Sequence, residues 1–255
     1  MTYKIIHLSD LHFGTEIPGI VAPLLADIVD QHPDLIIISG DMTQRALTYQ
    51  FKIARDFVAK LNQFPMLCIP GNHDISMHNL IERFFYPMKK YQRYITKNLS
   101  PEYVDNRMAI LGVNSATPYK LTSGFITNEQ LETICSFFNK QDHKKLKILI
   151  MHHNLIKSER HKIINDSERI ISAFAACSIN IVLSGHIHAP LIEKLKNNYL
   201  LYNMYIITAG TATSHRTVLP NSYNVIKVDE TEFKLEVREF AKGEFSLATE
   251  QTYKI

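Results

Sequence analysis

The chain has 255 residues, of which 45% are hydrophobic, and its formal net charge is +3 at pH 7. This length suits one large domain or two small ones, and the apolar content is sufficient for a sizeable core. The small net charge gives no strong indication of nucleic-acid binding, and no apolar run has the length of a membrane span. Because the first strand begins almost at Met1, it leaves no room for a secretory signal, and we expect a cytoplasmic protein.

The cysteines give little sign of a metal or disulfide framework. Cys68, Cys135 and Cys177 lie far apart, each among apolar neighbours, and none has the paired spacing of a zinc site. We therefore expect three reduced, buried thiols in a cytosolic protein.

The first third of the chain alternates strands and helices. We expect a strand over 3–8, a helix over 18–30 with Pro18 in its first turn, a strand over 35–38, a helix over 46–61 and a strand over 66–69. Right-handed crossovers place the carboxyl ends of these strands at the same edge of one sheet.

Each of these strands is followed by residues that can bind a metal. Asp10 and His12 are two apart and point the same way in an extended chain. Asp41 has two oxygens and could bridge two cations, and Asn72 offers a neutral carbonyl oxygen. The alternative for Asp10 is a helix cap with an incidental His12. His73, next to Asn72, can ligate a metal, donate to a phosphate or move a proton.

Residues 78–96 combine apolar side chains at helical spacing with Lys89, Lys90 and Arg93, and Pro87 interrupts the pattern. One interpretation is a pair of short amphipathic helices on the flank of the domain. The other is a lid, so that segment 78–100 would be a cap over the active site and offer positive charge and aromatic surface to a substrate.

The middle of the chain repeats the pattern of strands that end in potential ligands. We expect a strand over 108–113, a helix from the capping box at Thr127 to about 138, a strand over 146–151, a helix over 167–177 and a strand over 180–183. His152 and His153 follow the strand over 146–151, and His186 and His188 follow the last one.

After residue 190 the helical periodicity ends. Strands are predicted over 191–196, 199–209, 222–229, 232–240 and 244–250, with short turns such as Lys196-Asn197-Asn198. These strands predict an antiparallel half that packs against the first half, in one domain over residues 1–255.

Seven residues at strand ends share the chemistry of metal ligands: Asp10, His12, Asp41, Asn72, His152, His186 and His188. Imidazoles with carboxylates favour zinc, iron or manganese over calcium or magnesium. Seven ligands exceed what one tetrahedral ion takes, so a shared Asp41 suits a two-metal site that binds a phosphate. His73 is then the candidate catalytic group, which Asp74 could orient, although Asp74 could equally fix the turn.

Other polar residues have weaker assignments. His153 is interpreted as structural or as a supporting residue, because neighbouring residues in a strand point opposite ways. His7 is predicted to be a core histidine, and His215 and Arg216 are candidates for contact with a phosphate.

The ordered motifs resemble those of the calcineurin-like metallophosphoesterases from about residue 3 to residue 240. They are Asp10-x-His12, Gly40-Asp41, Gly71-Asn72-His73-Asp74, His152 and Gly185-His186-x-His188. Gly210-Thr211-Ala212-Thr213-Ser214 and the stretch from Pro220 to Ile226 resemble the bacterial cyclic-nucleotide phosphodiesterase branch.

The resemblance implies an α/β fold, a four-layer α/β/β/α sandwich of two mixed sheets flanked by helices. It also implies how the ligands divide: one metal takes Asp10, His12 and His188, the other takes Asn72, His152 and His186, and Asp41 bridges them. His73 is the implied catalytic histidine. The branch often has two prolines after its His-His pair, whereas Asn154-Leu155 stands here, so the substrate is left open.

We therefore expect a dinuclear-metal phosphodiesterase acting on cyclic nucleotides or other small phosphodiesters. One alternative is a pyrophosphate hydrolase on a nucleotide-linked lipid, with segment 84–95 in peripheral contact with the membrane, although such enzymes often have arginine where His73 stands. A nuclease lacks support from a strongly basic face. A non-catalytic scaffold would usually have lost ligands, and every position is occupied. The sequence does not predict the oligomeric state.

Overall fold

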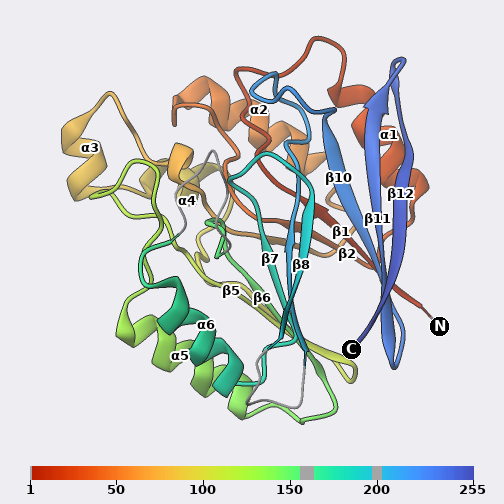
Figure 1. Cartoon of the computed structure of the whole chain (residues 1–255). Helices are drawn as coiled ribbons and strands as arrows, with labels where there is room; N and C mark the ends of the chain where they lie inside the picture. The colour runs from red at the N-terminus through yellow and green to blue at the C-terminus, as the bar shows by residue number, and fades with distance from the viewer. Residues whose placement is uncertain (1, 156–163, 197–202) are drawn as a thin grey trace.

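Two six-stranded sheets lie face to face at the centre of the molecule (Figure 1). The structure is a computed structural model that describes residues 2–155, 164–196 and 203–255. The first sheet has the strand order β12 (Glu244–Lys254), β11 (Glu232–Ala241), β10 (Ser222–Val228), β1 (Tyr3–Leu8), β2 (Leu35–Ile38) and β3 (Met66–Cys68). The second sheet has the order β4 (Glu102–Val104), β5 (Met108–Gly112), β6 (Leu146–Ile150), β7 (Ile181–Ser184), β9 (Asn203–Thr208) and β8 (Leu191–Lys196).

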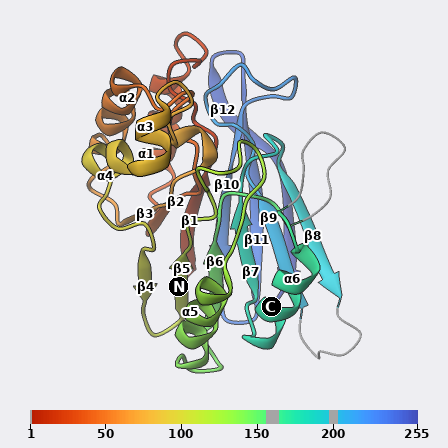
Figure 2. The same cartoon turned by 90° about the vertical axis from the view of Figure 1, so that its left-hand side faces the viewer.

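Helices cover the outer face of each sheet (Figures 1 and 2). The helices α1 (Val21–Asp30) and α2 (Thr48–Ala59) cover the first sheet, and α5 (Asn128–Asn139) and α6 (Ser167–Ala176) cover the second. Two short helices, α3 (Leu80–Phe85) and α4 (Lys89–Tyr94), follow the 3₁₀ turn at Asn72–Asp74. The result is the predicted four-layer α/β/β/α sandwich.

The alternation of side chains along each strand explains why four layers form. In β2, Leu35 and Ile37 pack between the two sheets, whereas Ile36 and Ile38 pack against α1 and α2. In β6, Ile148 packs between the sheets and Leu149 packs against α5 and α6. A strand buried on both faces needs a largely apolar sequence: β2 is apolar throughout, and β6 is apolar except for Lys147.

The C-terminal strands do not form a separate antiparallel half, and this prediction is wrong. β10 pairs with β1 in antiparallel orientation and brings β11 and β12 into the first sheet, whereas β9 runs parallel to β7 in the second. Both sheets are therefore mixed. The predicted turn at Lys196-Asn197-Asn198 and the start of the strand predicted over 199–209 lie outside the described residues, and β4 was not predicted.

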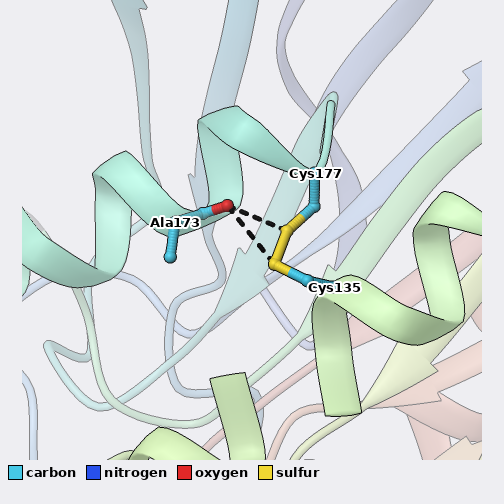
Figure 3. Close-up of a disulfide and its surroundings, with 3 residues drawn as sticks. All are labelled: Cys135, Ala173 and Cys177. Carbon is cyan, nitrogen blue, oxygen red and sulfur yellow. Dashed lines mark hydrogen bonds between the residues drawn. A yellow bond between two sulfur atoms is a disulfide. The ribbon is translucent and has the colours of Figure 1, made fainter. Parts of the chain in front are cut away.

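Two other expectations need correction. Helix α1 begins at Val21 rather than near Pro18, because Gly19 has φ +83°, a left-handed conformation that no helix contains. Cys135 and Cys177 are not reduced thiols but form a disulfide between α5 and the end of α6 (Figure 3). Their Cα atoms are 5.1 Å apart, and the carbonyl oxygen of Ala173 lies 2.9 Å from Cys177 Sγ. Cys68 is a free, buried thiol, as predicted.

Candidate metal centre and active site

The predicted site residues follow the carboxyl ends of five strands. Asp10 and His12 follow β1, Asp41 follows β2, and Asn72 follows β3. From the second sheet, His152 follows β6, and His186 and His188 follow β7. Because the sheets pack face to face, their strand ends meet at one edge, and all seven side chains are buried there.

The backbone at these positions differs from the extended chain that the sequence suggested. Asp10, His12, Asp41, His186 and His188 have φ values between 46° and 72°, which is the left-handed region. Non-glycine residues adopt this region rarely and at a cost of about 1–3 kcal/mol. The paired residues therefore converge through left-handed turns after the strand, not through strand alternation.

One group of donors forms around Asp10. His188 Nε2 lies 3.2 Å and His12 Nε2 lies 3.5 Å from Asp10 Oδ1, and the two imidazole nitrogens are 3.1 Å apart. Ligands about 2.1 Å from one ion, at tetrahedral or octahedral angles, lie about 3.0–3.4 Å from each other. The separations in this group suit the coordination of a single cation.

A second group forms around Asp41. His152 Nε2 lies 3.2 Å from Asp41 Oδ2 and 3.1 Å from Asn72 Oδ1. Asp41 Oδ2 is also 3.7 Å from His12 Nε2 in the first group, so the same oxygen faces both groups. His186 lies beside His152, with 5.3 Å between the ring centroids.

Hydrogen bonds at the rear of these side chains orient them toward the centre. The His186 N–H donates to Asp10 Oδ2 at 2.8 Å, and the His73 N–H donates to Asp41 Oδ1 at 2.8 Å. His152 Nδ1 lies 2.9 Å from the Ser39 carbonyl oxygen, which leaves Nε2 free to ligate. Asn72 Nδ2 donates to the Leu121 carbonyl, which turns its Oδ1 toward His152.

The donors fit a metal because the atoms facing the centre are otherwise unsatisfied. Asp10 Oδ1 and Asp41 Oδ2 are buried and accept no hydrogen bond from the described residues. A buried carboxylate oxygen without a donor is costly unless a cation compensates it. The two orphan oxygens are the ones that the two groups of imidazoles surround.

The electrostatics of the site also favour a cation. Burial alone would raise the pKa of Asp10, but the imidazoles of His188 and His12 hold it well below its usual range. Burial alone would lower the pKa of His152, but the carboxylates of Asp41 and Asp10 raise it to about 9. The carboxylates thus stabilise a positive charge at the centre.

Two glycines are required for the close approach of these loops. A Cβ on Gly71 would lie 2.1 Å from Asp41 Oδ1, and one on Gly185 would lie 2.4 Å from Asp10 Oδ2. These distances are far below van der Waals contact. A side chain at either position would displace the carboxylate that belongs to the centre.

Comparison with known proteins gives the family of this fold and site. Residues 3–190 match the profile described as calcineurin-like phosphoesterase, which is well over half of the chain. The chain belongs to the calcineurin-like phosphoesterase family. This confirms the predicted family.

The relatives within this family are distant. A probable glycerophosphodiester phosphodiesterase of Arcobacter nitrofigilis is 28% identical over 194 residues, which cover 73% of this chain and 66% of that protein. A probable cyclic nucleotide phosphodiesterase of Pseudoalteromonas is 24% identical over 202 residues, 72% of this chain and 71% of that protein. The chain thus spans just under two thirds of the first of these relatives.

A solved structure shows the same calcineurin-like phosphoesterase fold. A dimetal phosphatase from Danio rerio superposes with a TM-score of 0.71 at 10% identity, covering 96% of this chain and 98% of that one. At this identity the likeness concerns the fold alone. Among the described residues, no helix combines the length and hydropathy that crossing a bilayer requires.

His73 lies beside the donors of the candidate centre, and of the two roles that the sequence left open for Asp74, orienting His73 or fixing the turn, the structure shows the second. The Asp74 carboxylate accepts from the backbone N–H groups of Gly71 and Thr43, at 3.0 and 2.9 Å, so it fixes the turn. His73 Nδ1 instead lies 2.7 Å from the Gln44 carbonyl oxygen, which orients the ring. The opposite nitrogen, Nε2, lies 2.9 Å from Arg216 Nη1.

Arg216 is the residue whose role the sequence indicated least clearly. Its Nη1 is also 3.2 Å from Gln44 Oε1 and 3.5 Å from His12 Nδ1, so its guanidinium reaches the mouth of the centre. The neighbouring His215 is exposed. The sequence could not predict that the backbone carbonyls of Gln44 and Ser39 orient His73 and His152, because every residue type has a backbone carbonyl.

Two other histidines differ in how well they were predicted. His7 is fully buried in the first sheet with Nε2 2.9 Å from Ser39 Oγ, as expected of a core histidine. His153 does not point away from the cluster: its ring centroid lies 5.0 Å from that of His152 and 4.8 Å from that of His186. The alternation rule fails here because β6 ends at Ile150.

Proposed function

We propose that this chain is a two-metal phosphodiesterase whose ligands are the seven predicted residues. One ion would be held by Asp10, His12 and His188. The other ion would be held by Asn72, His152 and His186, and Asp41 would hold both ions. The observation that carries the proposal is the pair of buried carboxylate oxygens that face imidazoles and accept no hydrogen bond from the described residues. Nitrogen and oxygen ligands together favour manganese, iron or zinc.

The metals and the chain would divide the chemistry. When bound, the two ions would supply Lewis acidity toward the phosphate oxygens and a nucleophile at neutral pH. His73 would act at Nε2, since the Gln44 carbonyl holds its Nδ1–H. In the structure Arg216 Nη1 donates to His73 Nε2, so Nε2 would act on the phosphate or the leaving oxygen once the substrate takes the guanidinium.

Arg216 would help to bind the phosphate. Its Nη1 lies between His73 Nε2 and His12 Nδ1, where a substrate that enters the centre would meet it. A guanidinium is always charged and donates to phosphate oxygens in a fixed geometry, so it suits a phosphodiester anion.

We propose small phosphodiesters as substrates, with cyclic nucleotides and glycerophosphodiesters as the two candidates. The distant relatives carry both names, which supports the reaction class more than either substrate. The pyrophosphate hydrolase stays a second candidate because an exposed apolar segment, residues 80–86, follows the turn that carries Asn72 and His73.

A panel of substrates tests this function. The manganese-loaded protein is assayed side by side on a cyclic nucleotide, a glycerophosphodiester, a phosphomonoester and a nucleotide pyrophosphate. We expect the highest kcat/KM on a diester. His73→Ala should retain its metals and lose ~10²–10⁴-fold in kcat. A preference for the monoester or the pyrophosphate would overturn the proposal, and metal loss in His73→Ala would make His73 a ligand.

We further propose that residues 1–255 act as one catalytic domain and that the predicted cap, segment 78–100, borders the centre on one side. Hydrogen bonding between β1 and β10 supports a single unit, because it joins residues 3–7 to residues 224–228. The predicted cytoplasmic location stays a proposal, and the Cys135–Cys177 disulfide counts against it, because the cytosol keeps most thiols reduced.

A further inference from the structure

An exposed apolar surface lies beside the candidate metal centre. We call it the α3 face; it comprises Leu80, Ile81, Phe84, Phe85, Tyr86, Tyr119 and Leu121. Ile81 is 69% exposed, Phe85 74% and Tyr119 80%. Single exposed apolar residues are common on proteins, but a group of this size usually marks an interaction site.

Contacts between two segments of the chain hold the side chains of the α3 face together. This surface combines α3 with the loop over 117–121, and the rings of Phe84 and Tyr119 lie 6.0 Å apart. Arg83, only 5% exposed, joins the two segments: its Nε donates to the Pro118 carbonyl at 2.7 Å and its Nη2 to the Lys120 carbonyl at 3.2 Å. The buried guanidinium therefore holds the apolar side chains in one place.

This surface is connected directly to the metal centre. The carbonyl of Leu121, whose side chain belongs to the α3 face, accepts a hydrogen bond from Asn72 Nδ2 at 3.0 Å. The Asn72 side chain is one of the proposed metal ligands. A molecule that binds the α3 face therefore contacts Leu121, whose carbonyl is hydrogen-bonded to a proposed metal ligand.

The two segments of chain that carry the α3 face are positively charged. Residues 76–98 and 117–125 contain six lysines and arginines and one acidic residue, a net charge of +5. The whole chain carries +3, so the rest of it carries −2. The one acidic residue, Glu82, is already paired with Lys90 at 2.8 Å.

Some of these cations lie at the edge of the apolar side chains. Lys89 Nζ lies 5.1 Å from the centre of the Tyr86 ring, and Lys120 Nζ lies 5.1 Å from the centre of the Phe125 ring. Exposed phenylalanine, leucine and isoleucine surrounded by lysine and arginine is the composition of surfaces that bind anionic lipid bilayers.

We propose that the α3 face docks on an anionic lipid bilayer. A second copy of the chain fits less well, because it would bring two positively charged surfaces together. A nucleic acid would match the charge but would not cover the aliphatic side chains of Leu80 and Ile81. In a bilayer the apolar side chains reach the acyl boundary while the cations meet anionic headgroups.

Vesicle flotation tests the docking. The probes are vesicles of phosphatidylcholine alone and of phosphatidylcholine with phosphatidylglycerol, each at low and high salt. We expect binding to the anionic vesicles, weakened by salt. Ile81→Ser/Phe85→Ser should bind ~10-fold or more weakly, since it removes apolar area that would enter the bilayer. Lys89→Gln/Lys120→Gln should bind more weakly and respond less to salt.

The control is Val104→Ser/Leu247→Ser, which removes exposed apolar side chains from β4 and β12 and should bind like the wild type. Absence of wild-type binding, equal binding to both kinds of vesicle, or equal loss in the control would overturn the proposal. So would a dimer in solution that Ile81→Ser/Phe85→Ser dissociates, which would assign the surface to a second copy.

Activity on a soluble diester separates this proposal from the proposed function. The vesicle test itself needs no turnover, so it stands if the chain has another activity. Where the protein does hydrolyse a soluble diester, Tyr119→Ser, which removes an α3-face side chain outside the proposed cap, should bind vesicles more weakly and hydrolyse the diester at the wild-type rate. A parallel loss of activity and vesicle binding would instead indicate misfolding, which circular dichroism identifies, or a surface that belongs to the active site, and the latter would overturn the docking role.

Discussion

At the residue scale, each carboxylate of the centre divides its two oxygens between two tasks. One oxygen accepts a backbone N–H, from His186 in the case of Asp10 and from His73 in the case of Asp41. The other oxygen faces the imidazoles and accepts no hydrogen bond from the described residues. The backbone bond fixes the side chain, and the remaining oxygen is available to a cation.

Replacement of Asp41 tests this division. Asp41→Asn retains an oxygen for the His73 N–H but removes the charge that faces both groups of donors. We expect the metal content per chain, measured by elemental analysis, to fall from two ions toward one or none. Asp56 is exposed, so Asp56→Asn serves as the matched control and should bind two ions per chain. Two ions in Asp41→Asn would contradict a bridging role that depends on charge.

Arg216 offers a second test at this scale. Loss of a charged hydrogen bond to the phosphate costs about 1.5–3 kcal/mol, so Arg216→Gln should lower kcat/KM ~10–150-fold, mainly through KM. Arg216→Lys should recover part of this loss, and the adjacent His215→Gln should change little. Metal content should stay at the wild-type value in all three. A kcat/KM of Arg216→Gln equal to that of wild type would show that the guanidinium does not meet the substrate.

At the scale of elements, the second sheet is supported by helices that are themselves linked. Cys135 lies near the end of α5 and Cys177 directly follows α6, so the disulfide closes a loop with a sequence separation of 42 (Figure 3). This loop contains β6 and the proposed ligand His152. A cross-link of this length restricts the unfolded chain and typically stabilises a protein by about 2–4 kcal/mol.

Removal of the disulfide should therefore destabilise the protein. We expect Cys135→Ser/Cys177→Ser to unfold ~5–15 °C below the wild type in thermal denaturation. A reducing agent should lower the unfolding temperature of the wild type toward that of the variant and leave the variant unchanged. If the oxidised wild type and the variant unfold together, the disulfide does not contribute to stability.

At the scale of the whole molecule, the fold is closed by the meeting of its two ends in one sheet. β1 lies between β10 and β2, so the strand over residues 222–228 pairs with the first strand, and β11 and β12 extend the same sheet beyond it. His7 lies in β1 opposite Asn224 of β10, fully buried, with the Asn224 Nδ2 3.4 Å from its Nδ1. Burial lowers the pKa of His7 to about 3, so it is neutral in the folded protein.

This burial predicts a pH dependence of stability. Between pH 6.5 and about 3 the unfolded chain binds one more proton at His7 than the folded chain. The free energy of unfolding therefore falls as pH is lowered through this window, by up to about 1.4 kcal/mol per pH unit, and the effect ends below pH 3. The free energy of unfolding of His7→Gln should lack this pH dependence. Urea denaturation of the metal-free wild type and the metal-free variant from pH 8 to pH 4 measures the difference. Parallel curves for the two proteins would contradict it.

The sequence by itself determined the features that depend on residue type and local order. The largely apolar sequences of β2 and β6 predicted strands buried on both faces, and Thr127 predicted the start of α5. The seven candidate ligands were recognisable because each follows a strand. These features depend on short stretches of chain, which propensity and periodicity describe well.

Only the tertiary structure decided the features that depend on contacts between distant residues. It divided the C-terminal strands between two sheets, because the pairings of β10 with β1 and of β9 with β7 are not local. It joined Cys135 to Cys177, oriented His73 by the Gln44 carbonyl, and brought Arg216 to His73 across 143 positions of sequence. A local pattern cannot contain such contacts, because they arise only when the layers pack.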